Sequence, residues 1–173
     1  MKNIIIIGML IILLLFSFAR PVEAEVEHIT IRVDGLACPF CAYGLEKKIT
    51  KISGVMDYDV NMKEGKVFIG LKSDAHIEMS SLYKAVREAG FTLRNISLRA
   101  RGKIEQSDKG LILVFGGNRE RFLLFKKTSG RRLERKDIED IKDLEEEVVI
   151  EGVVEEQRGL PIGLSVNTLE RIE

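Results

Sequence analysis

Apolar and polar residues alternate along the first half of the chain in short runs typical of strands, interrupted by two runs at helical spacing. Pro39 suits the first turn of the first helix, and Gly90 suits the C-terminal cap of the second. A last strand begins near Phe91, so the order β-α-β-β-α-β predicts a ferredoxin-like α+β domain over residues 25–98. The expected inward positions are, element by element, Ile29, Ile31 and Val33; Cys41, Leu45, Ile49 and Ile52; Met56, Tyr58, Val60 and Met62; Val67, Ile69 and Leu71; Leu82, Ala85, Val86 and Ala89.

The second half, residues 99–173, has longer apolar runs and predicts a small mostly-β domain. Ile138, Ile141 and Leu144 recur at helical spacing and predict one helix within residues 136–146. Three strands, a helix and two strands is the element order of an OB-type barrel. No Gly/Ser/Pro-rich linker separates the halves, so we expect the last strand of the first domain to run almost directly into the second. Strand-like runs lie at residues 98–104, 111–115, 122–125, 148–154 and 162–166.

The N-terminal segment, residues 1–24, is patterned as a secretory signal peptide. Lys2 precedes an apolar core, and Val22-Glu23-Ala24 forms a small-residue cleavage site. The core is short for a bilayer, which needs roughly 20 apolar residues, so an uncleaved anchor is the alternative. Either way we expect the remainder to be exported, to the periplasm or the extracellular space, with no membrane insertion after cleavage.

Composition narrows the range of partners. The chain has 173 residues with 27 Lys+Arg and 27 Asp+Glu, so it lacks the basic field on which non-specific nucleic-acid binding depends. Phe115, Phe122 and Phe125 are therefore expected in the barrel core and not as base-stacking residues. No group of side chains indicates catalysis, and we expect no enzyme. His28 and His76 are the only histidines, and we expect both to be ordinary surface residues.

The soft-ligand chemistry is concentrated in Cys38 and Cys41, which flank Pro39-Phe40 where a strand gives way to a helix. A helix N-terminus carries partial positive charge, and thiols placed there have pKa values of roughly 3.5–7.5 against about 8.5 for free cysteine. The resulting thiolates are both metal ligands and nucleophiles. We expect a partner to reach Cys38, in the loop, first. Cys41 lies on the same helix face as Leu45 and Ile49, so we expect it to be the more protected sulfur.

The first domain resembles the heavy-metal-associated (HMA) family, which includes periplasmic mercuric-ion-binding proteins and copper chaperones. The resemblance implies that Cys38 and Cys41 bind the metal and that a membrane metal transporter or another thiol carrier receives it. Leu36 replaces the usual Met of the family motif, and it is an apolar residue of similar volume. The matching positions are Gly35, Cys38 and Cys41 of the motif G-M-x-C-x-x-C, Gly54-Val55, and Ala89-Gly90-Phe91.

Two thiolates favour one soft ion, Cu(I) or Hg(II), passed on by ligand exchange. Zn(II) or Cd(II) is less favoured and would draw an oxygen from Asp34. The rival hypothesis is a thiol-disulfide oxidoreductase that uses the Cys-Pro-Phe-Cys pair. Against it, no proline follows the motif within the first domain, where thioredoxin-like proteins place one against the disulfide. A structural disulfide is the least favoured alternative, because crosslinking so short a loop stabilises little. An oxidising compartment would favour a Cys38–Cys41 disulfide, which cannot bind metal, so the carrier must be kept reduced or be loaded early.

Overall fold

The computed structural model of the chain describes residues 26–72, 75, 77–115, 121–139, 141, 144, 146–155 and 162–172. The signal peptide predicted over residues 1–24 lies outside this part of the chain, and so does His76. Within the described ranges, every helix is too short or too polar to span a lipid bilayer.

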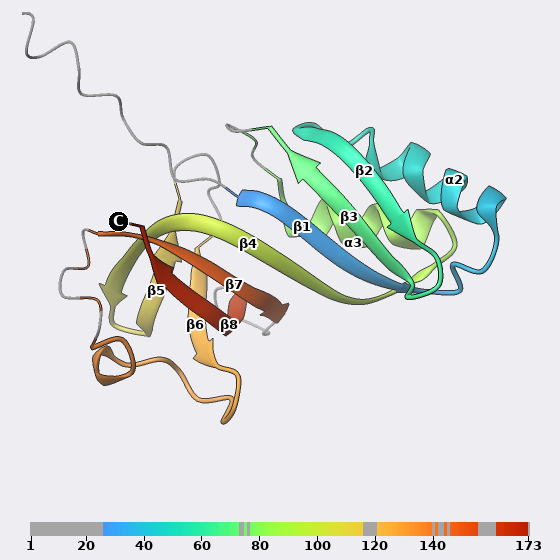
Figure 1. The fold of residues 1–173 in the computed structure, drawn as a ribbon. Helices are drawn as coiled ribbons and strands as arrows, with labels where there is room; N and C mark the ends of the chain where they lie inside the picture. Colours follow the sequence, from blue (N-terminus) through green and yellow to red (C-terminus); the bar gives the residue numbers. More distant parts are fainter. Residues whose placement is uncertain are drawn as a thin grey trace, which may run out of the picture.

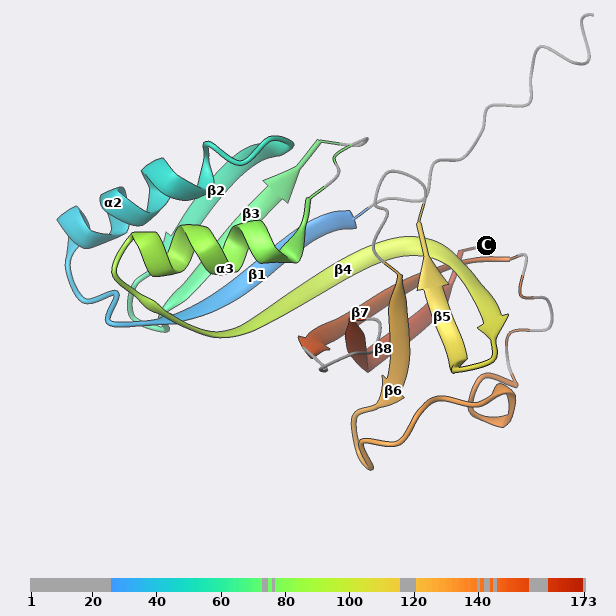
Figure 2. The ribbon, with the colours of Figure 1, turned by 180° about the vertical axis from the view of Figure 1, so that it is seen from behind.

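The first half has the predicted order of elements. It comprises β1 (Val26–Asp34), α2 (Pro39–Ile49), β2 (Val55–Asn61), β3 (Lys66–Leu71), α3 (Met79–Glu88) and β4 (Thr92–Ser107). The four strands pair antiparallel in the spatial order β2-β3-β1-β4. Both helices cover the same face of this sheet, as Figure 1 and Figure 2 show from opposite sides. The ferredoxin-like prediction for this half is therefore confirmed.

Two details of the first half differ from the predicted pattern. Helix α2 ends at Ile49 with Thr50 as its cap, so Ile52 packs against the core from the turn that follows. Met56 and Met62 are 68% and 42% exposed, and their assignment to the core was wrong. The register of β2 shifts between Val55 and Asp57, which takes Met56 out of the alternation, and Met62 lies beyond the end of the strand.

Strand β4 joins the two halves. It is 16 residues long and runs without a break from the helix-covered sheet into the second half (Figure 1). The first part of β4 pairs with β1, and its last residues pair with β5 (Gly110–Val114). A stripe of alternate residues is buried along its length, and a single apolar cluster extends across both halves. The predicted direct connection is thus confirmed, and the predicted boundary at residues 98–99 falls inside β4. The stripe consists of Ile96, Leu98, Ala100, Gly102 and Ile104.

The second half contains the five predicted strand regions. After β4 and β5 come β6 (Phe122–Lys126), β7 (Glu147–Glu155) and β8 (Gly163–Arg171). Neighbours pair in the order β4-β5-β6-β8-β7, and β7 also pairs with β4, which closes the sheet on itself. Strands β6 and β8 are parallel. Phe115 and Phe122 stack in the shared core with ring centroids 5.6 Å apart, whereas Phe125 is buried in a separate small cluster with Ile112 and Leu123.

The helix predicted within residues 136–146 is not present in the described part of that segment. A single 3-10 turn, η1 (Arg135–Asp137), replaces it, although Ile138 and Ile141 are still buried. The order of charges over residues 131–147 disfavours a helix. Most of the basic residues come before or at the start of the predicted helix, and Glu145, Glu146 and Glu147 close the stretch, where acidic side chains oppose the dipole of an α-helix. The apolar spacing that indicated a helix therefore reflects burial without helix formation.

Candidate metal centre

The cysteine loop is positioned by the end of β1 and the start of α2. Gly35 follows β1 with φ of +86°, a left-handed conformation that favours glycine, and it turns the chain toward the helix. Leu36 is only 4% exposed and belongs to the shared core, so it anchors the loop from below. Cys38 is the N-cap of α2 and Pro39 occupies the first turn, as the sequence predicts.

Cys38 interacts directly with the helix N-terminus. Its Sγ accepts a hydrogen bond from the backbone N–H of Cys41 at 3.2 Å, which is the capping contact of α2. Helix α2, which is described throughout, has no acidic residue in its first turn, and Lys47 and Lys48 lie in its last turn. The positive end of the helix dipole is therefore left free to stabilise negative charge on the sulfurs.

The two sulfurs are brought together, as predicted, and in the structure they form a disulfide. The Cα atoms of Cys38 and Cys41 are 5.2 Å apart. Both residues are half-buried, so the expected difference in exposure between them is not seen. A disulfide has no thiolate to offer a metal, so binding at this loop requires prior reduction.

Three aromatic residues lie in or near the cysteine loop. Phe91 is half-buried, and its Cδ1 lies 3.7 Å from where a Cβ on Gly35 would be, which puts the ring against the loop. Phe40, between the cysteines, is 88% exposed, and Tyr43 is 53% exposed with Lys47 Nζ 4.6 Å from its ring centroid. Neither Phe40 nor Tyr43 belongs to the site predicted from the sequence. Both lie off the apolar face of the helix that carries Leu45, and this position could have indicated two exposed aromatic residues near the thiols.

Tyr58, which the alternation of β2 predicts only as a core residue, also contacts the helix that carries the cysteines. Its hydroxyl donates a hydrogen bond to the carbonyl oxygen of Ala42 at 3.5 Å, which connects β2 to the helix that carries the cysteines. Burial raises the pKa of Tyr58 to about 12, and the negative charges of Glu46 and Asp59 contribute to this shift. The phenol is therefore neutral at physiological pH and acts as a hydrogen-bond donor.

Asp34, the candidate oxygen ligand, has a partner of its own. It is the last residue of β1, and its carboxylate forms an ion pair with Arg94 of β4. His28 is exposed on β1, as expected. Within the part of the chain that the structure describes, no cluster of three or more His, Cys, Asp or Glu side chains could hold a metal ion. The described donor set at this loop is thus the cysteine pair.

The region that contains the cysteine loop matches a known protein family. Residues 30–92 match the model of the heavy-metal-associated domain. The mercuric transport protein periplasmic component of Pseudomonas fluorescens is 30% identical over 79 residues, which cover 46% of this chain and 86% of that protein. The copper chaperone CopZ of Staphylococcus saprophyticus is 28% identical over 65 residues, 38% of this chain and 94% of the chaperone.

Solved structures match over the same region. Oxidized MerP from Ralstonia metallidurans CH34 is 28% identical with a TM-score of 0.36, and the match covers 40% of this chain and 94% of MerP. From the match at residues 30–92 and the 30% identity across most of the mercuric transport component, we conclude that this chain belongs to the heavy-metal-associated domain family.

Proposed function

We propose that this protein is an exported carrier that holds one Cu(I) or Hg(II) ion between the reduced sulfurs of Cys38 and Cys41. The observation that carries the proposal is the position of the pair, with Cys38 capping α2 and Cys41 in its first turn. Free helix N–H groups and the helix dipole favour the ionised sulfurs that a soft metal binds. The names of the relatives, a mercuric transport component and a copper chaperone, are consistent with this cargo.

The donor chemistry favours these two ions over harder ones. Thiolates are soft ligands, and two of them suit ions that accept low coordination numbers. Zn(II) prefers four ligands, and Cd(II) or Zn(II) here would require an oxygen from Asp34. The ion pair of Asp34 with Arg94 competes with that role. We therefore keep Zn(II) and Cd(II) as the less favoured cargo.

Delivery would proceed by exchange of thiolates at the metal. A thiolate of the acceptor, a membrane metal transporter or another thiol carrier, forms a bond to the ion as one metal–sulfur bond to this chain breaks. A second acceptor thiolate then replaces the remaining cysteine. The metal keeps its oxidation state throughout, and each departing sulfur leaves as a thiolate or takes up one proton. Exposed Phe40 and Tyr43 beside the pair would contact the acceptor first.

Loading requires that the Cys38–Cys41 disulfide be opened first. A dithiol reductant supplies two electrons and two protons, and its own two thiols become a disulfide. The direct test is native mass spectrometry of the reduced protein titrated with Cu(I) and with Hg(II). We expect one ion per chain for the reduced protein, and none for the oxidised protein or for the double variant C38S/C41S. Equal uptake by the double variant would falsify the assignment.

A second candidate function is thiol-disulfide oxidoreductase activity, and the disulfide between Cys38 and Cys41 is the observation that favours it. Pro39 between the cysteines adds a resemblance to Cys-Pro-x-Cys redox sites. An insulin-reduction assay separates the two functions. Robust turnover without metal would favour the oxidoreductase, whereas the carrier should show none, since we propose that this protein is not an enzyme.

We further propose a two-domain organisation with an OB-type barrel over residues 99–173. The strand order β4-β5-β6-β8-β7, the closing pair β4–β7 and the parallel pair β6–β8 support this interpretation. A role in docking or scaffolding fits a domain that adjoins the carrier through β4.

Export with removal of residues 1–24 is supported by the leader pattern and by the periplasmic name of the mercuric relative. N-terminal sequencing of the secreted protein tests the cleavage site.

A further inference from the structure

The second half contains a cavity that the proposed metal function does not use. It has a volume of about 320 Å³ and lies between the end of β6, strand β8 and the segment that connects β6 to β7. The cysteine loop between β1 and α2 lies at the opposite end of the molecule (Figure 1). Sites for small molecules have volumes of roughly 300–1,000 Å³, so this cavity has the size of a small binding site.

One wall of the cavity is apolar and consists of buried side chains. Leu133, Ile138 and Ile141 line it from the connecting segment and are 6%, 4% and 1% exposed. Val166 and Leu169 of β8 line the other side and are half-buried. The connecting segment is the one that forms a single 3-10 turn where a longer helix was expected. An apolar lining of this kind favours a ligand with a hydrocarbon body.

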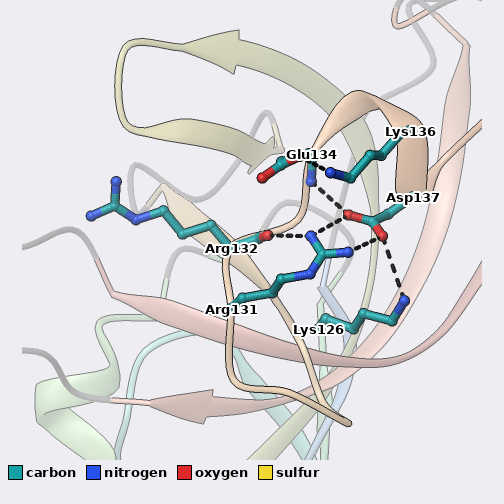
Figure 3. A network of polar contacts seen from close by, with 6 residues as sticks. All are labelled: Lys126, Arg131, Arg132, Glu134, Lys136 and Asp137. Atoms are coloured by element: carbon teal, nitrogen blue, oxygen red, sulfur yellow. Dashed lines mark hydrogen bonds and ion pairs between the residues drawn. The ribbon is translucent and has the colours of Figure 1, made fainter.

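The rim on the β6 side carries a network of charged side chains (Figure 3). The guanidinium of Arg131 donates two hydrogen bonds to the carboxylate of Asp137, and the backbone N–H of Glu134 donates a third at 3.0 Å. Arg131 holds the pKa of the Asp137 carboxyl well below its usual range, so this group is ionised and fully engaged. Lys126 lines the cavity and lies 3.5 Å from the same carboxylate, a loose contact for an ammonium group.

The rim on the β8 side is also cationic. Arg171 lines the cavity, and its guanidinium lies 3.7 Å from the carboxylate of Glu146. Lys126 and Arg171 are 46% and 45% exposed, so each can turn toward a ligand without leaving a buried charge behind. Arg131 donates two hydrogen bonds to Asp137, and among the residues that the structure describes Glu146 is the other carboxylate that contacts one of these cations. Two cations in the lining favour an anionic head group at the mouth of the cavity.

We propose that this cavity binds a small amphipathic carboxylate, such as a medium-chain fatty acid. The carboxylate pairs with Lys126 and Arg171 at the rim, and the alkyl chain lies against Ile138, Ile141 and Leu169. Binding is non-covalent and does not involve the cysteines, so it is independent of the metal-carrier function. The binding of decanoate to the whole protein can therefore be measured whatever the state of the thiols.

The test is isothermal titration calorimetry of the purified protein with decanoate, at low and at moderate salt. We expect saturable one-to-one binding that weakens with shorter chains and with added salt. The variants K126Q and R171Q should each weaken binding about tenfold, the loss expected for one charge-assisted hydrogen bond. Neighbouring Lys127 is exposed and does not line the cavity, so K127Q is the matched control and should bind as the parent does.

The neutral analogue decanol distinguishes the head group from the chain. We expect it to bind at least several-fold more weakly than decanoate, since it cannot pair with two cations. Three outcomes would overturn the proposal: absence of saturable decanoate binding, equal affinity of K126Q and R171Q to the parent, or the same loss in K127Q as in K126Q. Circular dichroism of each variant checks that the fold is kept, which is expected because all three side chains are exposed.

Discussion

Gly102 lies in the buried stripe of β4, where the two halves share one apolar core, and its replacement tests whether they fold as one unit. A Cβ at this position would lie 2.5 Å from the carbonyl oxygen of Val114 and 3.2 Å from Cδ1 of Leu113. The first of these atoms is backbone, held by the pairing of Lys103 with Val114. It cannot rotate away as a side chain could, so Gly102→Ala must displace β5 from β4.

The size of the effect follows from this geometry. A carbon and a carbonyl oxygen ordinarily meet at roughly 3.3–3.6 Å, so the strands must separate by about 0.8 Å or more. Overpacking of a well-filled core costs about 1–3 kcal/mol. We therefore expect Gly102→Ala to lower the free energy of unfolding by about 2 kcal/mol, which lowers the urea midpoint by about 1 M for a typical slope.

The assay uses the distribution of chromophores. The chain has no Trp and three Tyr, at positions 43, 58 and 83, all in the first half. Tyrosine fluorescence therefore reports unfolding of the half that carries the cysteines, and far-UV circular dichroism reports both halves. If the shared core makes folding cooperative, the two signals should move together in Gly102→Ala, although the substitution lies in the part of β4 that pairs with β5 and β7.

Gly44→Ala is the matched control. Gly44 lies in α2, and a Cβ at this position would have no described side chain, and no backbone beyond its own helix, within 4 Å. This change should therefore leave stability unchanged or raise it by up to about 1 kcal/mol through helix propensity. A Gly102→Ala protein whose tyrosine transition stays at the parental midpoint, while circular dichroism shows a second, earlier transition, would refute the shared core.

Three further predictions concern individual side chains. Tyr58→Phe should remove the titration step at pH about 12 from the 295 nm absorbance of the folded protein. The pKa of Tyr58 in the folded protein lies above the unfolded value of 10.0, so the unfolded state ionises first as the pH rises. The parent should therefore lose more stability than the variant between pH 10 and 12. Asp137→Asn should reduce the loss of stability, measured by urea unfolding, between pH 5 and 2. Arg131 lowers the pKa of the Asp137 carboxyl, so this group stabilises the fold above its ordinary pKa of 3.8 and loses that contribution in acid. An unchanged dependence of stability on acid pH would contradict the proposed Arg131–Asp137 interaction. Gly35→Ala should cost about 1–2 kcal/mol from its left-handed φ alone, measured by urea unfolding, while native mass spectra of the reduced protein still show one metal ion per chain.

Features that depend on near neighbours could be predicted from the order of residues alone. The alternation around Ile29 and the helical spacing of Leu45 and Ile49 predicted the elements of the first half, and these have the predicted order. Cys38 before Pro39 predicted the helix start that brings the sulfurs together. Each of these signals lies within a few residues of the feature that it describes, because turns, caps and amphipathic periods are local properties of the backbone.

Features that depend on residues far apart in the chain became visible only in the folded molecule. The register shift in β2 that exposes Met56, the contact from Tyr58 to Ala42 and the closure of β7 onto β4 each require a partner that the local pattern does not specify. The segment containing Ile138 and Ile141 shows the limit most clearly, since its apolar spacing was that of a helix. Spacing reports which side chains are buried, whereas the fold of the backbone also depends on charges and on the strands against which those side chains pack.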